Sequence, residues 1–258
     1  MKILNGSELA GFIKERQFQV VRGMSKKPCL AIIRDSDNPV IMKYVQLKQQ
    51  YGEDIGVEVR DVLAHGVDGI RTAIEQANND RDVNGIILQL PILDRDATDG
   101  LTNLIAPEKD VDGLSTNGNF DSATATAINW LLGGYNIDLA GKKIALVGHG
   151  KLVGAPLERM WTNSGFDVTV FQKGDDLSTL SNYDIIVTAT GVPHLIKNEF
   201  VRGGAVVVDA GTASEDGVLV GDLDEAVRER QDLAAITPRT GGVGPLTVGC
   251  LFEHVINA

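Results

Sequence analysis

The sequence predicts an α/β protein of two domains, on the strength of three observations. Apolar runs rich in β-branched residues alternate with helical patterns along the chain, which is typical of parallel sheets covered by helices. This alternation occurs in two successive series. The chain has 258 residues, 43% of them apolar, which is enough for two cores. We therefore expect domains at residues 1–120 and 121–245, with a terminal helix at 246–258 that packs back onto the first domain.

The first series contains three expected strands, at residues 29–34, 57–62 and 85–90. Helical patterns at 40–55 and 68–78 separate these strands, and alanines and leucines favour another helix at 122–132. The second series starts with a strand at 143–147, a glycine-rich turn and a helix that runs to about residue 163. Further strands are expected at 168–171, 185–189, 205–209 and 233–236.

Composition excludes several classes of protein. The net charge of -11 argues against a nucleic-acid surface and against binding to anionic membranes. The two cysteines, Cys29 and Cys250, are far apart in apolar settings and fit no disulfide framework or metal site. The four histidines do not cluster, and no apolar run is long enough for a membrane span. A cytoplasmic protein without a bound metal is expected.

The glycine-rich turn reads Gly148-His-Gly150-Lys-Leu-Val-Gly154 between a strand and a helix. Glycines at such a turn let the backbone approach a pyrophosphate, and the free amides at the start of the helix receive the anion. The pattern predicts a dinucleotide site. The alternative is a tight turn whose glycines serve only helix–strand packing.

The end of the following strand indicates which coenzyme is used. An NAD site usually places an acidic residue there, for the ribose hydroxyls, and NADP sites replace it with basic or neutral donors. This chain reads Phe171-Gln-Lys173-Gly, and Asp175 and Asp176 come only afterwards. We expect NADP, with Lys173 as the phosphate partner and NAD as a possible substitute; a solvated loop lysine is the alternative.

Three segments of the first series place polar groups at the edges of apolar elements. Tyr44 and Lys48 are spaced i, i+4 and so share a helix face. Gln89 ends an apolar strand, and Asp112 lies in an Asp-Gly turn. A phenol, an amine, an amide and a carboxylate could thus meet one polar heteroaromatic ligand. Taken singly, Lys48 also fits a solvated helix lysine, Gln89 a strand cap, and Asp112 half of a turn pair with Asp110.

These segments resemble the methylenetetrahydrofolate dehydrogenase/methenyltetrahydrofolate cyclohydrolase family over nearly the whole chain. The resembling blocks are Tyr44-x-x-x-Lys48, Gly85-Ile-Ile-Leu-Gln-Leu-Pro91, Pro107-Glu-Lys-Asp-Val-Asp-Gly113, Val208-Asp-Ala-Gly211, Gly221-Asp-Leu-Asp224 and Gly241-Gly-Val-Gly-Pro-Leu-Thr247. The resemblance implies a folate-site domain, a Rossmann domain, an active-site cleft between them and a homodimer. It also implies tetrahydrofolate one-carbon derivatives as substrates and a place in one-carbon metabolism and purine biosynthesis.

The resemblance also implies individual roles. Lys48 would be the catalytic lysine, Tyr44 its neighbour stacked on the substrate, Gln89 its hydrogen-bonding partner, and Asp112 the anchor of the pterin ring. Gly244 and Pro245 would contact the substrate as well. The implied coenzyme contacts are Gly148, His149, Gly150, Lys151, Gly154, Lys173, Thr190, Gly191, Gly211 and Thr212.

Several positions depart from the family pattern. The family's Gly-Arg-Ser turn is here Gly148-His149-Gly150, which removes two expected donors to the coenzyme phosphate. Ile41 replaces the serine three residues before the tyrosine, Pro238-Arg-Thr240 replaces a Pro-Val-Pro loop, and Asp121-Ser-Ala-Thr-Ala-Thr126 replaces a Pro-Cys-Thr-Pro-like segment. Three alternatives stay open: a monofunctional member, a dinucleotide-binding sensor without chemistry, and an unrelated Rossmann oxidoreductase acting on a small acid.

The implied chemistry suits a lysine base. A methenyl cation about 4 Å from an ammonium repels it by roughly 4 kcal/mol at an effective dielectric near 20. Lys48 would therefore tend to be neutral when water must be activated, and Gln89 would orient it without adding charge.

Overall fold

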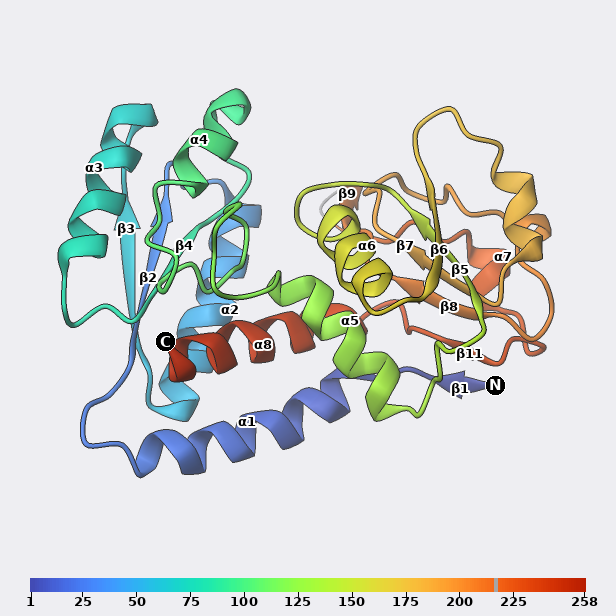
Figure 1. Cartoon of the computed structure of the whole chain (residues 1–258), viewed down its shortest axis with the longest axis horizontal. Helices are drawn as coiled ribbons and strands as arrows, with labels where there is room; N and C mark the ends of the chain where they lie inside the picture. Colours follow the sequence, from blue (N-terminus) through green and yellow to red (C-terminus); the bar gives the residue numbers. More distant parts are fainter. Residues whose placement is uncertain (216–217) are drawn as a thin grey trace. The chain divides into compact units, whose positions relative to one another are not determined.

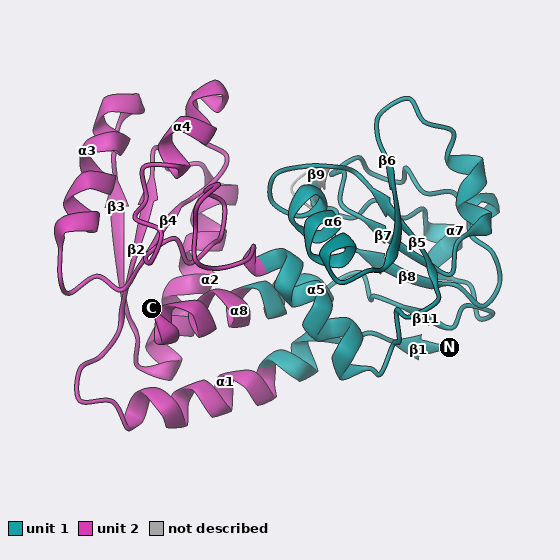
Figure 2. Ribbon diagram, viewed as in Figure 1, with its two compact units in different colours: residues 1–10, 124–247 teal, residues 11–123, 248–258 magenta. Residues whose placement is uncertain are grey.

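The computed structural model of the chain describes residues 1–215 and 218–258, which form two α/β units (Figures 1 and 2). Unit 1 consists of residues 1–10 and 124–247, and unit 2 of residues 11–123 and 248–258. The α/β fold class is confirmed. No helix within the described residues is long and apolar enough to cross a membrane.

Unit 1 is built on a six-stranded sheet in the order β1-β11-β8-β7-β5-β6, in which every pairing is parallel. Its strands are β1 (Lys2–Ile3), β5 (Lys143–Val147), β6 (Asp167–Phe171), β7 (Ile185–Thr188), β8 (Val206–Asp209) and β11 (Ala235–Ile236). From β5 the chain crosses to β6 on one side and then returns to β7 on the other. This reversal is the place where open α/β sheets bind ligands, at the carboxyl ends of the strands.

The remaining elements of unit 1 are short. They are α5 (Ala123–Gly134), α6 (Gly154–Asn163), α7 (Glu225–Arg228), the 3₁₀ turns η2 (Leu177–Asn182) and η3 (Asn198–Phe200), and the antiparallel pair β9 (Ala213–Glu215) and β10 (Val218–Val220). Ala123 itself belongs to unit 2. Inward side chains of β5, β7 and β8, such as Val147, Ile186 and Val207, form the core of this unit.

Unit 2 contains a three-stranded parallel sheet in the order β3-β2-β4. Its elements are β2 (Cys29–Arg34), α2 (Pro39–Ile55), β3 (Glu58–Leu63), α3 (Gly66–Asn79), β4 (Gly85–Leu88), the 3₁₀ turn η1 (Arg95–Ala97) and α4 (Thr98–Thr102). All residues of β2 and β4 are buried, whereas those of β3, at the sheet edge, are half-buried or exposed. Burial on both faces explains why β2 and β4 read as continuous apolar runs.

Two segments near the start of the chain were not expected from the sequence. Helix α1 (Gly6–Arg22) has a largely polar sequence, and strand β1 pairs with β11. From the sequence, the first ten residues are expected to belong to the first domain. The structure places them in unit 1, because Lys2 and Leu4 donate backbone hydrogen bonds to Ala234 and Ile236.

Other elements differ from expectation mainly at their ends. Strand β4 ends at Leu88 instead of residue 90, and β11 covers only residues 235–236 of the expected 233–236. Helix α8 (Val243–Asn257) begins three residues before the expected segment at 246, so Gly244 and Pro245 lie in its first turn. Proline is well tolerated there, because the first helical amides have no partner within the helix.

Candidate functional site

Lys48 and Gln89 are joined by a hydrogen bond in unit 2. The Lys48 ammonium Nζ donates to Gln89 Oε1 at 2.7 Å. Helix α2 presents the lysine, and its start is fixed by Asn38, whose side-chain oxygen accepts from the Val40 amide at 2.9 Å. Tyr44 lies one turn before Lys48 on α2 and is half-buried. Gln89 directly follows buried strand β4 and is 9% exposed, so it can orient the lysine.

Burial controls the charge of this cluster. Burial lowers the pKa of Lys48, and the negative charge of Asp112 partly opposes that change. Burial raises the pKa of Asp112 to about 6, while Lys48 lowers it and Asp110 raises it. Burial also raises the pKa of the Tyr44 phenol. The neutral amine is therefore more accessible at Lys48 than at a solvated lysine, as a general base requires.

The turn that carries Asp112 is fixed by its two neighbours Lys109 and Asp110. Lys109 Nζ donates to the backbone oxygens of Ala77, Asn78 and Asp80 at 2.7 to 3.0 Å, at the end of α3. The Asp110 carboxylate is buried and accepts from the amides of Gly113, Leu114 and Ser115. Asp110 thus uses its oxygens within the turn, and Asp112 is the carboxylate left for a ligand.

His254 of α8 is a contributor that the sequence analysis missed. Its Nδ1 lies 2.7 Å from the backbone oxygen of Val111, and because a carbonyl can only accept, this nitrogen carries the proton. The ring stacks on Phe120 with centroids 4.7 Å apart. Burial lowers the pKa of His254, which favours the neutral ring. Val111 precedes Asp112, so the helix fixes the residue next to the candidate pterin anchor.

In unit 1 the glycine-rich turn has the close packing that a dinucleotide site needs. Gly148 has φ +97°, and its amide donates to the Phe171 oxygen at 2.8 Å, between the ends of β5 and β6. A Cβ at Gly154 would lie 2.1 Å from the Gly148 oxygen, so α6 begins directly against the turn. A Cβ at Gly150 would meet nothing within 4 Å. The turn is therefore tight on its protein side and open at Gly150, which fits a pyrophosphate.

The loops after β7 and β8 meet this turn. A Cβ at Gly148 would lie 2.7 Å from the Ala189 oxygen and 3.1 Å from the Thr190 methyl carbon. A Cβ at Gly191 would lie 3.3 Å from the Thr212 oxygen. The structure thus brings the predicted coenzyme residues of three loops together at the carboxyl end of the unit 1 sheet.

His149 and Gly150 stand where the family has its two donors, and the His149 side chain lies against α6. His149 Nε2 lies 2.6 Å from Glu158 Oε2 of α6, and both side chains are about one-third exposed. Lys151 follows in the same turn and is half-buried. The departure at His149 therefore changes side chains and leaves the backbone cradle of the glycines in place.

Lys173 lies in the turn that follows β6 and is exposed. The Asp175 carboxylate accepts from the Gln172 amide at 2.7 Å, and Asp176 accepts from the Ser178 amide at 3.0 Å, where it caps η2. Both acidic residues are thus used within their own turns. Among the described residues, the exposed Lys173 side chain forms no hydrogen bond or ion pair.

The two other predicted substrate contacts, Gly244 and Pro245, belong to unit 1, whereas Lys48, Gln89 and Asp112 belong to unit 2.

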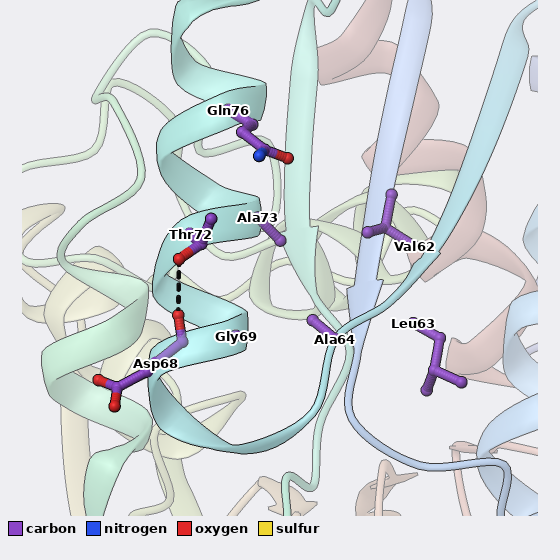
Figure 3. A pocket seen from close by; sticks show the side chains of 8 residues that line it. All are labelled: Val62, Leu63, Ala64, Asp68, Gly69, Thr72, Ala73 and Gln76. Carbon is purple, nitrogen blue, oxygen red and sulfur yellow. Dashed lines mark hydrogen bonds between the residues drawn. The ribbon is translucent and has the colours of Figure 1, made fainter.

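A separate cavity of about 430 Å³ lies in unit 2 between β3 and α3 (Figure 3). Its lining residues are Val62, Leu63, Ala64, Asp68, Gly69, Thr72, Ala73 and Gln76, and none of them is a predicted site residue. Within the described residues no group of three His, Cys, Asp or Glu side chains could hold a metal ion.

Comparisons with known proteins also divide the chain into two functional domains. The tetrahydrofolate dehydrogenase/cyclohydrolase catalytic domain matches residues 4–112, and the NAD(P)-binding domain of the same family matches residues 122–258. A Hydrogenobaculum protein called bifunctional protein FolD is 36% identical over 275 residues, covering 100% of this chain and 98% of its own.

Solved structures give the same result. The bifunctional enzyme FolD, a methylenetetrahydrofolate dehydrogenase/cyclohydrolase from Campylobacter jejuni, superposes with a TM-score of 0.93 at 32% identity, covering 100% of this chain and 98% of its own. The Trypanosoma brucei dehydrogenase-cyclohydrolase, complexed with NADP cofactor and inhibitor, gives 0.89 at 27% identity, covering 98% and 95%. With both of its domains matched along the sequence, the chain belongs to the tetrahydrofolate dehydrogenase/cyclohydrolase family.

Proposed function

We propose that the chain oxidises methylenetetrahydrofolate to methenyltetrahydrofolate with NADP, and hydrolyses the methenyl form to formyltetrahydrofolate. The observation that carries this proposal is the Lys48–Gln89 hydrogen bond of 2.7 Å, with the charge of Asp112 close enough to act on the lysine. A lysine held by a neutral amide suits hydrolysis of a cation, because the amide orients the amine without the negative charge by which a carboxylate would favour the ammonium form.

In the hydrolytic step, Lys48 takes the proton from the water that attacks the methenyl carbon. The positive charge of the substrate and the burial of the amine both favour neutral Lys48 at that moment. Gln89 keeps the nitrogen lone pair directed by accepting one of the lysine's hydrogens. The bond from that carbon to one of its two nitrogens then breaks, the leaving nitrogen takes up the hydroxyl proton, and the formyl product remains while Lys48 gives its proton to solvent.

Asp112 binds the pterin in this proposal. A carboxylate matches the paired N–H donors of an aminopyrimidine edge. The turn built by Asp110 and Lys109 holds Asp112 in place before the ligand arrives. Tyr44, one turn from Lys48, contributes a ring face for the folate.

The residues of unit 1 fit a nicotinamide dinucleotide. Gly148, Gly150 and Gly154 would hold the pyrophosphate through the backbone and the start of α6, and Thr190, Gly191, Gly211 and Thr212 would complete the site. The coenzyme supplies the hydride acceptor of the first reaction. His149 and Lys151 would contact its phosphates as charged or neutral donors.

We infer that the coenzyme is NADP, as in the related Trypanosoma brucei structure. The support within the chain is that Gln172 stands where an NAD site has an acid, and that Asp175 and Asp176 bond to their own turns. Lys173 is then the side chain that would pair with the 2′-phosphate.

We also propose that the enzyme is a cytoplasmic homodimer whose product serves purine biosynthesis. Edge strand β3 is the surface of unit 2 that supports dimerisation, because Leu63 is 39% exposed and Val62 lines the cavity of Figure 3. Light scattering after gel filtration tests this directly: a mass near 27.6 kDa would mean a monomer, whereas a dimer has twice that mass.

One pair of absorbance assays tests the proposed reactions. Reduced coenzyme should form from methylenetetrahydrofolate with NADP, and methenyl absorbance should decay faster with enzyme than without it. If only one assay responds, the chain is monofunctional. Coenzyme binding without either reaction would indicate a sensor, and the absence of folate affinity would indicate a different oxidoreductase.

A further inference from the structure

Two aspartates next to the coenzyme loops have no role in the mechanism above, although both are buried. Asp209 ends β8, and only 3% of its side chain is exposed. Asp222 follows β10 and is 0% exposed. They belong to the sequence blocks Val208-Asp-Ala-Gly211 and Gly221-Asp-Leu-Asp224. A buried carboxylate is costly unless donors satisfy it, so its partners indicate what it does.

Each aspartate packs against a glycine within two residues of the other aspartate, an arrangement here called the Asp–Gly clasp (Asp209, Gly211, Gly221 and Asp222). A Cβ at Gly211 would lie 2.0 Å from Asp222 Oδ1. A Cβ at Gly221 would lie 2.0 Å from Asp209 Oδ2. Neither glycine can be replaced without displacing a buried carboxylate, which explains physically why the two blocks occur together.

The clasp holds backbone of the coenzyme loops. Asp222 Oδ2 accepts from the Thr190 amide at 2.7 Å and from the Thr188 hydroxyl. Asp209 Oδ1 accepts from the amides of Gly211 at 3.0 Å and Asp222 at 3.2 Å. The loop after β7 is thus tied to Asp222, and the loop after β8 is tied to Asp209.

The two carboxylates differ in charge compensation. Asp209 pairs with the buried guanidinium of Arg228, and its Oδ2 also accepts from the Leu223 amide. Asp222 Oδ1 has no hydrogen-bond partner among the described residues. An apolar side chain would avoid this buried, unpaired oxygen but could not hold Thr190, so the hydrogen bonds of Asp222 account for its presence.

We propose that Asp222 is a positioning residue for the coenzyme, which acts by holding the loop of Thr190 and Gly191 against the loop of Gly211 and Thr212. Backbone groups bind a dinucleotide well only if they are already in place, because ordering them on binding weakens affinity. Asp222 lies beneath both loops and needs no contact with the coenzyme itself. This inference rests on the proposed use of NADP.

The test compares coenzyme-dependent and coenzyme-independent reactions of the full chain. Asp222→Ala removes the acceptor of Thr190, and we expect the KM for NADP to rise about 10-fold or more. Methenyl hydrolysis without coenzyme should stay within about twofold of wild type, because Lys48, Gln89 and Asp112 are untouched. Asp222→Asn keeps one acceptor oxygen for Thr190 and should recover most of the NADP affinity.

Asp224→Asn is the matched control. Asp224 lies two residues further on, caps α7 by accepting from the Ala226 amide at 3.1 Å, and pairs with Lys197 at 2.9 Å. Asparagine also caps helices well, so this variant should keep wild-type KM values. Thr188→Val removes the hydroxyl donor to Asp222 and should raise the NADP KM in the same direction, and it replaces Asp222→Ala in the test if that variant does not fold.

Two results would overturn the proposal. An unchanged NADP KM in both Asp222→Ala and Thr188→Val would show that the clasp does not position the coenzyme. Equal losses of hydrolysis and NADP affinity would show a general structural role. Titration of NADP into the wild-type protein separates failure of this proposal from failure of the proposed function. If the protein binds NADP without turnover, the proposed function fails, but the effect of Asp222 on NADP affinity can still be measured.

Discussion

The proposed folate side and the proposed coenzyme side of this enzyme are built from different kinds of groups. Around Asp112 the working groups are side chains that other side chains hold in place: Gln89 holds Lys48, and Asp110 and Lys109 hold the turn. Around Gly148 the working groups are backbone atoms, and the fit depends on missing side chains, as at Gly154. Chemistry on a cation needs a particular functional group, whereas a pyrophosphate needs only amides brought close together.

This difference explains which departures from the family the chain tolerates. His149 changes a side chain within a backbone-built site, and the turn keeps its close packing. All four proposed side chains of the folate side are present unchanged. Substitutions that remove a functional group should therefore act mainly on the folate side, and those that add volume mainly on the coenzyme side.

The largest effect is expected at Lys48. Lys48→Met keeps the stem and removes the titratable amine, so methenyl hydrolysis should fall by about 100-fold or more. Hydride transfer should suffer less, because it needs positioning more than proton removal. Lys43→Met, at an exposed lysine of the same helix, is the control and should stay close to wild type. If both reactions of Lys48→Met stay near wild type, Lys48 is not the base.

Added volume tests the coenzyme side. Gly154→Val places atoms where a Cβ already comes within 2.1 Å of the Gly148 oxygen, so NADP affinity should fall by about 10-fold or more. Methenyl hydrolysis should be retained. Gly133→Ala in α5, where a Cβ meets nothing within 4 Å, should leave both reactions unchanged. Normal NADP titration of Gly154→Val would contradict a backbone-built site.

Asp112 tests the folate side while the Lys48 side chain stays in place. Asp112→Ala leaves the donors of the pterin without an acceptor, which costs about 1 to 3 kcal/mol of folate binding. Coenzyme binding should barely change. Isothermal titration with a folate measures the loss, and Asp82→Ala, at an exposed aspartate paired with Lys26, is the control. Unaltered folate affinity would remove Asp112 from the site.

Gln89→Glu shifts the pH dependence of hydrolysis. A carboxylate in place of the Gln89 amide, whose oxygen lies 2.7 Å from Nζ, stabilises the ammonium form and so raises the pKa of Lys48. Since the neutral amine is the base, the rising limb of the pH–rate profile should move to higher pH. Gln46→Glu, on the exposed side of α2, should leave the profile where it is. A rate that instead falls as the pH rises through this range, with the falling limb moved to higher pH in Gln89→Glu, would mean that the ammonium form is the active one.

The smallest effect is expected at Lys173, because an exposed lysine interacts weakly with a solvated phosphate. Lys173→Ala should weaken NADP by a few-fold, on the order of 1 kcal/mol, and NAD hardly at all. Lys143→Ala, at the opposite end of the unit 1 sheet, is the control. Equal losses for NADP and NAD would show that Lys173 does not read the 2′-phosphate.

Much of this organisation was predictable from the sequence, and the failures have physical causes. Strands β2 and β5 were predicted with their observed ends, because they are short, continuous apolar runs. Helix α1 was missed because its buried face includes Gln17, whose side chain bonds to Tyr51 and to the Gly249 oxygen. A polar residue at a buried position hides the apolar periodicity that would mark a helix.

The candidate site shows the same limit. Lys48, Gln89 and Asp112 follow local patterns and could be named in advance. The contact of His254 with Val111 and the Asp–Gly clasp join segments that are distant along the chain, so no local spacing indicates them. Sequence patterns therefore name the candidate ligand-binding side chains but do not indicate the residues that hold those side chains in place.

The bond between His254 and Val111 also sets an order of events during synthesis of the protein. These partners are 143 positions apart, and every strand of both sheets precedes His254 in the chain. A nascent chain on the ribosome can therefore complete the strands of unit 2 long before the carbonyl beside Asp112 gains its donor. Folate capture should thus develop only after the strands that precede His254 have had time to form.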